Sequence, residues 1–237
     1  MQALLRIVLA SCIGAWAGLI HAAALQISPV LVDMAPQQAA SGIMLRNPGN
    51  TPIYGQVRIY RWDQEGGDDV LTATEEVQAS PPIIQVAPGG EQLVRLVRAS
   101  RELGPTERSY RLIIDEIPDP DTPGVNGVVL RLRYSVPVFV AGAAPSPAPD
   151  LAWQVQQAGD AWVLRLSNTG TRYAQVAALQ ILNDAGKPVA NVDGLLGYAL
   201  AQRAREWRIP AKQKAPGSVR IKALINGDVV TVSPRID

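Results

Sequence analysis

The sequence predicts an all-β protein, and three observations support this prediction. Apolar and polar residues alternate in many short segments, which is the period of a half-buried strand. The chain contains 20 glycines and 19 prolines, and many of them lie in turn clusters between these segments. No segment carries the apolar stripe at every third or fourth residue that an amphipathic helix needs.

Residues 1–24 have the pattern of a secretory signal peptide. Arg6 gives a positive start, a long apolar run follows, and Ala22–Ala24 are small residues suited to cleavage before Leu25. The residues before Cys12 resemble a lipoprotein cleavage box, but the chain stays apolar after it. We therefore expect cleavage at Leu25 and a periplasmic protein without lipid. No later apolar run is long enough to span a bilayer, so we expect no membrane span in the mature chain.

The composition excludes several kinds of chemistry. The only cysteine and the only histidine, Cys12 and His21, both lie in the leader, so the mature chain would have no disulfide, thiol nucleophile or histidine ligand. Loss of Arg6 leaves one basic residue fewer than the 22 of the whole chain, which balances its 21 acidic residues. A neutral chain without a basic stripe argues against nucleic-acid binding.

Two acidic clusters are candidates for a catalytic or metal-binding site. Asp63–Asp69 and Asp115–Asp121 are rich in carboxylates, which serve glycoside hydrolysis or calcium binding in other proteins. Neither cluster has the ordered spacing of a calcium loop, and the chain has no nucleophile elbow or phosphate-binding glycine loop. We therefore expect no enzyme activity, no catalytic residue, no metal site and no cofactor, and we interpret these carboxylates as solvated turn residues.

Seven strands are predicted in the first half of the chain. Turn clusters at Asn47–Asn50, Glu65–Asp69 and Ala87–Gly90 separate several of them. The predicted strands are Leu25–Met34, Gly42–Arg46, Ile53–Trp62, Ile83–Val86, Glu91–Arg98, Ser109–Ile117 and Val128–Val140.

The second half is predicted to be β as well. A segment of small residues and prolines at Ala141–Asp150 separates it from the first half and is expected to be extended and stiff. The predicted strands are Ala152–Gln156, Ala161–Ser167, Tyr173–Asn183, Gly197–Leu200, Arg205–Ile209, Ser218–Ile225 and Val229–Val232.

Seven short strands in each half favour two immunoglobulin-like β-sandwich domains. The expected boundaries are a signal peptide at 1–24, an N-terminal domain at 25–142, a linker at 143–150 and a C-terminal domain at 151–237.

The segment Val128–Val140 is the longest alternating run in the chain. Its apolar register holds Val128, Leu130, Leu132 and Tyr134 and continues through three valines to Val140. An apolar strand of this length invites aggregation unless it is covered. It either fills the core of its own domain or stays available for pairing with another chain, and the pattern alone leaves both readings open.

Several motifs together resemble the periplasmic chaperones of the chaperone–usher pathway, the PapD-like pilus assembly chaperones. Ser80–Gly90 leads into an alternating segment at Gln92–Leu96, and Glu107–Pro118 precedes the long alternating run. Gly197–Trp207 is similar to part of the family's second domain. The resemblance covers residues 25–237, and the segment Tyr134–Phe139 is similar to the archaic branch of these chaperones.

The resemblance implies a boomerang of two immunoglobulin-like domains that binds pilin or fimbrial subunits and delivers them to an outer-membrane usher. The first domain lends a strand to a subunit that lacks one. On this reading Val128, Leu130, Leu132 and Tyr134 enter the subunit, and the ladder of the donated strand completes its sheet. A secreted two-domain adhesin or carbohydrate-binding module remains the alternative, for which the dispersed tryptophans of both halves would supply binding surfaces.

The chain lacks two charged residues that are typical of the family's best-known branch. The best-known branch holds the subunit's C-terminal carboxylate with an arginine and a lysine, and the matching residues here are Leu31 and Ser135. A hairpin in which Pro118 opposes Gly127 would place Arg111 opposite Tyr134, near the vacant lysine position. We therefore predict Arg111 as the carboxylate anchor, since a guanidinium binds carboxylates bidentately. The resemblance also implies a structural ion pair between Arg95 and Glu107.

Overall fold

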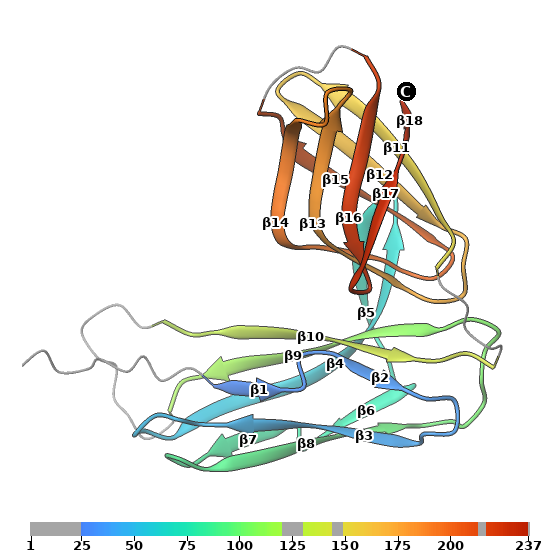
Figure 1. Cartoon of the computed structure of the whole chain (residues 1–237). Helices are drawn as coiled ribbons and strands as arrows, with labels where there is room; N and C mark the ends of the chain where they lie inside the picture. The colour runs from blue at the N-terminus through green and yellow to red at the C-terminus, as the bar shows by residue number, and fades with distance from the viewer. Residues whose placement is uncertain (1–24, 120–129, 144–148, 213–216, 237) are drawn as a thin grey trace, which may run out of the picture.

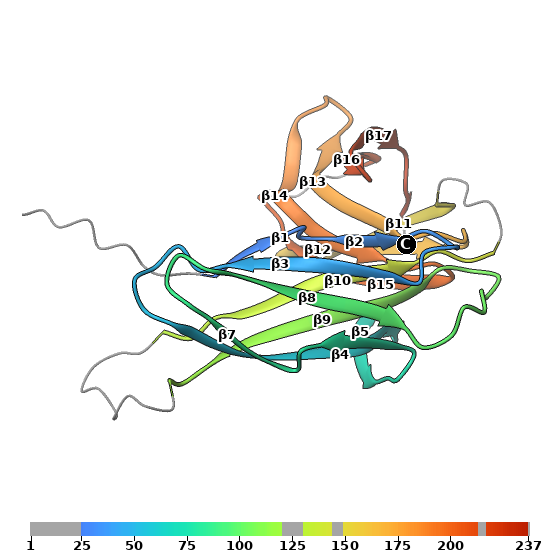
Figure 2. The same cartoon turned by 90° about the horizontal axis from the view of Figure 1, so that it is seen from below.

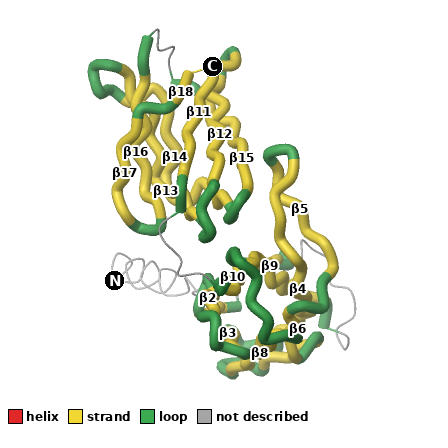
Figure 3. Tube along the Cα trace, turned by 90° about the vertical axis from the view of Figure 1, so that its right-hand side faces the viewer, coloured by secondary structure: helices red, strands yellow, loops and turns green. Residues whose placement is uncertain are grey.

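The computed structural model describes residues 25–119, 130–143, 149–212 and 217–236. Within these ranges all regular elements are strands, and they form two sandwiches that follow one another along the chain (Figure 1). The sandwiches meet at an angle, which Figure 3 shows from the side. The predicted all-β fold of two immunoglobulin-like domains is therefore confirmed. The described ranges contain no helix long and apolar enough to cross a membrane.

The first sandwich consists of two sheets whose strands run along its length (Figure 2). One sheet has the strand order β1-β3-β8-β6, and the other has the order β2-β10-β9-β4-β5, with β7 paired to β4. The strands are β1 (Gln26–Ser28), β2 (Val32–Met34), β3 (Ala40–Arg46), β4 (Ile53–Glu65), β5 (Asp68–Ala73), β6 (Val77–Ser80), β7 (Ile83–Val86), β8 (Glu91–Arg98), β9 (Arg108–Ile117) and β10 (Arg133–Val140).

Alternation along these strands builds the core between the two sheets. In β9, for example, Tyr110, Leu112 and Ile114 face inward and are buried. They pack against inward residues of β3 and β8, such as Ile43 and Leu96, which are fully buried. Burial of side chains of this size contributes about 1.5–3 kcal/mol each and holds the two sheets together.

The second sandwich has the same construction. One sheet has the order β15-β12-β11-β18, and the other has the order β14-β13-β16-β17, with a core that includes Trp162, Leu164 and Ile181. Its strands are β11 (Leu151–Ala158), β12 (Ala161–Asn168), β13 (Ala174–Asn183), β14 (Pro188–Ala199), β15 (Arg203–Pro210), β16 (Val219–Ile225), β17 (Asp228–Val232) and β18 (Arg235–Ile236).

The structure corrects several predicted strands. The predicted strand Leu25–Met34 is two strands, because the chain leaves the first sheet at Pro29 and joins the second sheet at Val32. Strands β5, β6 and β18 were not predicted, and β14 begins at Pro188, well before the predicted Gly197. β14 has register shifts against β13 that interrupt its alternation, which explains why the pattern did not reveal it.

Candidate functional site

The long alternating segment is divided into two parts. β10 begins only at Arg133, so the prediction of one continuous strand from Val128 is wrong for the described residues, and Val128 itself lies outside them. Val138 is fully buried in the first sandwich, together with the valines on either side of it in the same register. Leu130 is 78% exposed, and Leu132 and Tyr134 are half-buried. One end of the segment therefore fills the protein's own core, whereas the other end offers apolar side chains.

The same end of β10 has an open edge. β9 pairs with β10 along its whole length, but β2 pairs only with Val138–Val140. No described strand pairs with Arg133–Pro137 on that side. Because the N–H of Glu116 donates to the Leu132 carbonyl, the backbone groups of Arg133 and Ser135 face away from β9. An open edge beside exposed apolar residues is suited to accept a strand from another chain.

The predicted register of the β9–β10 hairpin is wrong by three residues. Arg111 lies opposite Pro137, and Tyr134 lies opposite Ile114. The prediction assumed a short loop after Pro118, but the ladder begins only near Leu132. Hairpin register follows from the length and geometry of the connection, which alternation does not fix.

Arg111 nevertheless lies at a distinctive place. Its guanidinium carbon is 3.6 Å from the centre of the Trp62 ring and 5.4 Å from that of Tyr198. Burial lowers the pKa of Arg111 from its usual value. No ion pair or hydrogen bond within the described residues engages its guanidinium, although five N–H donors are available there. A planar cation stacked on an indole with free donors is suited to bind a carboxylate.

The two positions that carry charge in the family's best-known branch are uncharged here, and their environments differ. Leu31 packs against an aromatic cluster at the junction of the sandwiches, whereas Ser135 is exposed on β10. Arg111 is therefore the basic residue of β9 and β10 that reaches this aromatic cluster.

The aromatic cluster fixes the two sandwiches against each other. Trp62 and Phe139 come from the first sandwich, and Tyr173, Tyr198 and Leu200 come from the second. The rings of Phe139 and Tyr173 stack with centres 3.7 Å apart. Such packing holds the sandwiches in one relative orientation.

Gln64 adds polar contacts to this junction. Its side-chain amide donates to the Tyr198 carbonyl over 2.8 Å and accepts the Leu200 N–H over 3.0 Å. Because Gln64 is buried, these bonds also satisfy a polar group that would otherwise lose its hydration.

The carboxylates at the tip of the β4–β5 hairpin are only partly the solvated turn residues that the sequence suggested: Glu65, Asp68 and Asp69 are exposed, but the tip also contacts the second sandwich. β5 extends from the first sandwich toward the second, where the tip docks on β15 (Figure 3). Asp63 pairs with Arg203, and Asp68 pairs with Arg205. The Glu206 N–H donates to the Gly67 carbonyl over 3.1 Å. The alternation of Arg203 and Arg205 on one strand was the signal that sequence reasoning missed.

The predicted ion pair between Arg95 and Glu107 does not form among the described residues. Arg95 lies on the exposed face of β8, opposite Gly42 and Ser80. Glu107 lies at the junction, where it accepts the Tyr173 N–H over 3.0 Å. Burial raises the pKa of Glu107 to about 8. Glu107 therefore joins the sandwiches without a cationic partner from β8.

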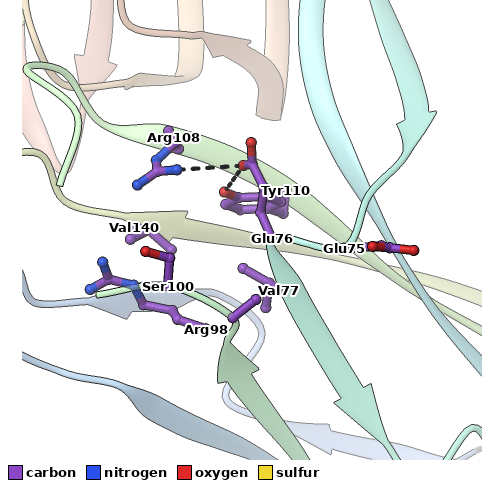
Figure 4. A pocket seen from close by; sticks show the side chains of 9 residues that line it. Glu75, Glu76, Val77, Arg98, Ser100, Arg108, Tyr110 and Val140 are labelled. Carbon is purple, nitrogen blue, oxygen red and sulfur yellow. Dashed lines mark hydrogen bonds and ion pairs between the residues drawn. The ribbon is translucent and has the colours of Figure 1, made fainter. Parts of the chain in front are cut away.

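A pocket of about 260 Å³ lies at the opposite end of β10 from Leu130 and is lined by Val140, Glu76 and Tyr110, among others (Figure 4). The Tyr110 hydroxyl donates to Glu76, and this hydrogen bond, with help from Arg61, lowers the pKa of the Glu76 carboxyl. Glu76 at the pocket wall is thus bonded to Tyr110 and paired with Arg61 and Arg108, whereas no described strand pairs with the open edge at Arg133 and Ser135.

Several solved chaperone structures are similar to this chain over most of its length. The chaperone in the CsuC–CsuE pre-assembly complex from archaic chaperone–usher Csu pili of Acinetobacter baumannii matches at 24% identity and a TM-score of 0.71, covering 91% of this chain and 100% of that one. The E. coli chaperone DraB matches at 19% identity and a TM-score of 0.61, covering 91% and 97%. A chain of the Salmonella enterica complex between SafA pilin and the SafB chaperone matches at 14% identity and a TM-score of 0.62, covering 89% and 96%.

The family comparison covers the sandwich that carries the open edge. No curated protein matches the chain in a sequence search. Residues 24–145, about half of the chain, match the family described as pili and flagellar-assembly chaperone, PapD N-terminal domain. The chain therefore belongs to the family of pili and flagellar-assembly chaperones.

Proposed function

We propose that this protein is a periplasmic chaperone that binds pilus or fimbrial subunits, keeps them folded by donating the segment that leads into β10, and delivers them to an outer-membrane usher. The observation that carries the proposal is the division of the alternating segment. Leu130, Leu132 and Tyr134 stand beside an unpaired strand edge in a protein whose family assembles pili. Val128 continues this register in the sequence and is proposed as a further donated residue.

The physical logic of donation is simple. A subunit that lacks one strand exposes an apolar groove and unpaired backbone groups, and both promote aggregation. Alternate side chains of the donor fill the groove, and the open edge supplies backbone hydrogen bonds. The protein acts on this view by binding, without a covalent step.

Arg111 is proposed as the anchor of the subunit's C-terminal carboxylate. It lies one strand away from the open edge, its donors are free within the described residues, and Leu31 and Ser135 offer no charge. This arrangement and the sequence Tyr134–Phe139 support placing the chain in the archaic branch of the family, as does the likeness to the Csu chaperone.

Co-expression tests the proposal. The chain is produced in the periplasm with secreted subunits encoded beside its gene, and complexes are purified through a tag on the chaperone. We expect a one-to-one complex with a subunit that degrades when expressed alone. Binding of glycans by the free chain, with no subunit recovered, would favour an adhesin or carbohydrate-binding module.

A single substitution then locates the binding surface. Leu130→Glu places a charge in the subunit groove, where burial without a partner costs several kcal/mol, so capture should be lost. The free variant should stay folded, because this side chain is exposed. Val229→Glu, at a valine that is 65% exposed on β17, is the matched control and should capture normally. Loss of folding in Leu130→Glu would show that this residue belongs to the protein's own core.

A further inference from the structure

Two adjacent carboxylates at the end of β9 contact the start of β10 from opposite faces of the sheet. Tyr110, Leu112 and Ile114 of β9 face the core, so Asp115 lies on the outer face and Glu116 on the inner one. On the outer face Asp115 accepts hydrogen bonds from Arg133 of β10 and from Arg58 of β4.

On the inner face Glu116 bonds the donated segment itself. One carboxylate oxygen accepts the hydroxyl of Tyr134 over 3.2 Å, and the other accepts the N–H of Leu132 over 3.3 Å. The Glu116 N–H donates to the Leu132 carbonyl over 3.0 Å. In a regular antiparallel pair the Leu132 N–H would donate to the backbone carbonyl of Glu116. At the end of the ladder the Glu116 carboxylate accepts this N–H in place of the backbone carbonyl.

Electrostatics favour the same arrangement. Partial burial alone would raise the pKa of Asp115, but the hydrogen bonds from Arg133 and Arg58 outweigh it, and this pKa lies below its ordinary value. Burial, together with the nearby Glu116 carboxylate, raises the pKa of Tyr134 to about 12. Asp115 therefore stays ionised and the Tyr134 hydroxyl stays a donor at neutral pH.

We infer that Asp115 and Glu116 are positioning residues that hold Leu132–Tyr134 extended in the free protein, before a subunit arrives. This inference rests on the proposed function, because it concerns the segment that would be donated. A segment that was not held in this way would lose conformational freedom on binding. A segment that is already extended avoids this loss at the binding step, which is the general benefit of preorganisation.

Preorganisation makes a kinetic prediction. The contacts of Glu116 exist in the free protein, and the subunit would pair with the opposite edge of the strand. Glu116→Ala should therefore slow subunit association roughly tenfold, the effect of about one hydrogen bond. Dissociation should change much less. Glu116→Gln should fall between Glu116→Ala and the wild type, because its carbonyl can accept one of the two hydrogen bonds but carries no charge.

Amide hydrogen exchange in the free chaperone tests the inference without any subunit. In the wild type the Leu132 amide should exchange slowly, and Glu116→Ala should accelerate it roughly tenfold. Tyr134→Phe should weaken the same protection, whereas Glu91→Ala, a loss of an exposed carboxylate on β8, should leave it unchanged.

The association rate is then measured with the subunit recovered by co-expression. Faster exchange at Leu132 together with slower association supports the inference. Unchanged exchange in Glu116→Ala, or accelerated exchange with an association rate equal to that of the wild type, would overturn it. The proposed function fails separately, through normal capture by Leu130→Glu.

Discussion

The two ends of one alternating segment have opposite environments. From Val136 to Val140 the apolar side chains are buried in the first sandwich, and β10 is paired on one side or both. From Leu130 to Tyr134 the same register is exposed or half-buried, and one edge is open. The same pattern of residues thus lies in two environments, and the difference comes from where β2 stops pairing with β10.

This contrast explains how a single strand can serve two proteins. The buried end fixes the strand in the first sandwich through Val136, Val138 and Val140. At the other end Leu130 is exposed, and no described strand pairs with the outer edge at Arg133 and Ser135, although Tyr134 partly packs against the protein's own core. Stability and binding are therefore expected to depend on different residues of one segment.

The largest effect is expected from a charge at the buried end. Val138→Asp places an unpaired carboxylate in the core of the first sandwich, which should destabilise folding by more than about 4 kcal/mol. Urea denaturation of the free protein measures this loss, with Val229→Asp on the exposed face of β17 as the control. A wild-type unfolding midpoint for Val138→Asp would contradict the assignment of this end to the core.

The next effect concerns the carboxylate anchor. Arg111→Ala should weaken subunit binding about ten- to a hundredfold, the value of a lost charge-assisted bond of about 1.5–3 kcal/mol. Arg111→Lys should recover only part of the affinity, because lysine lacks the planar fork. Arg131→Ala, at an exposed arginine on the same hairpin, should have little effect.

A peptide comparison sharpens the anchor test. A peptide of the subunit's C-terminal segment is titrated as the free acid and as the amide. Arg111 should discriminate between them, and Arg111→Ala should bind both with equal weak affinity. If the wild type bound the free acid and the amide with equal affinity, the anchor would lie elsewhere.

A smaller effect is expected from Glu107 at the junction. Its folded-state pKa is raised to about 8 by burial, so the folded protein holds a proton that the unfolded chain loses near its ordinary pKa. The stability that this group contributes should be present at low pH and should fall between about pH 5 and pH 8. Glu107→Gln should flatten this slope in urea denaturation followed across that range.

The slope should not vanish in this variant, because burial also raises the pKa of Asp33 at the same junction, although Arg172 and Tyr173 oppose this. An equal slope in the wild type and in Glu107→Gln would show that Glu107 does not bind a proton on folding.

The smallest effect is expected from the hairpin tip. Arg203→Ala removes a partly exposed ion pair with Asp63, which should cost about 0.2–1 kcal/mol. Arg208→Ala is the control for general charge effects, because it removes an exposed ion pair with Asp160 whose two partners both belong to the second sandwich. High salt should reduce the Arg203 effect, as expected for exposed charges. A loss of several kcal/mol would mean that the ion pair, more than the aromatic cluster, joins the sandwiches.

Alternation in the sequence predicted most of the fold, because period two is a local property of strands. Most of the strands follow from it, but it left open whether the apolar register of Val128–Val140 is buried in the protein's own core or exposed. It predicted only the end of β14, whose bulges break the period, and it missed the break at Pro29, where one strand changes sheets.

The site was less predictable because its contacts join distant parts of the chain. Arg111 was predicted as the anchor from a register that is wrong by three residues, and its contact with Tyr198 depends on how the sandwiches dock. Likewise, nothing local links Asp63 to Arg203. Strand propensity and the two-residue period of alternation describe neighbours along one strand, whereas these contacts depend on tertiary packing.

Backbone exchange along β10 tests the division of the segment most directly. The amides of Arg133 and Ser135 face the open edge, whereas the amide of Val138 faces β9. In the free protein we predict fast exchange at Arg133 and Ser135 and slow exchange at Val138. In the complex with a subunit, Arg133 and Ser135 should become protected by at least about tenfold while Val138 stays as it was. Slow exchange at Ser135 in the free protein, or no gain of protection there in the complex, would contradict the account.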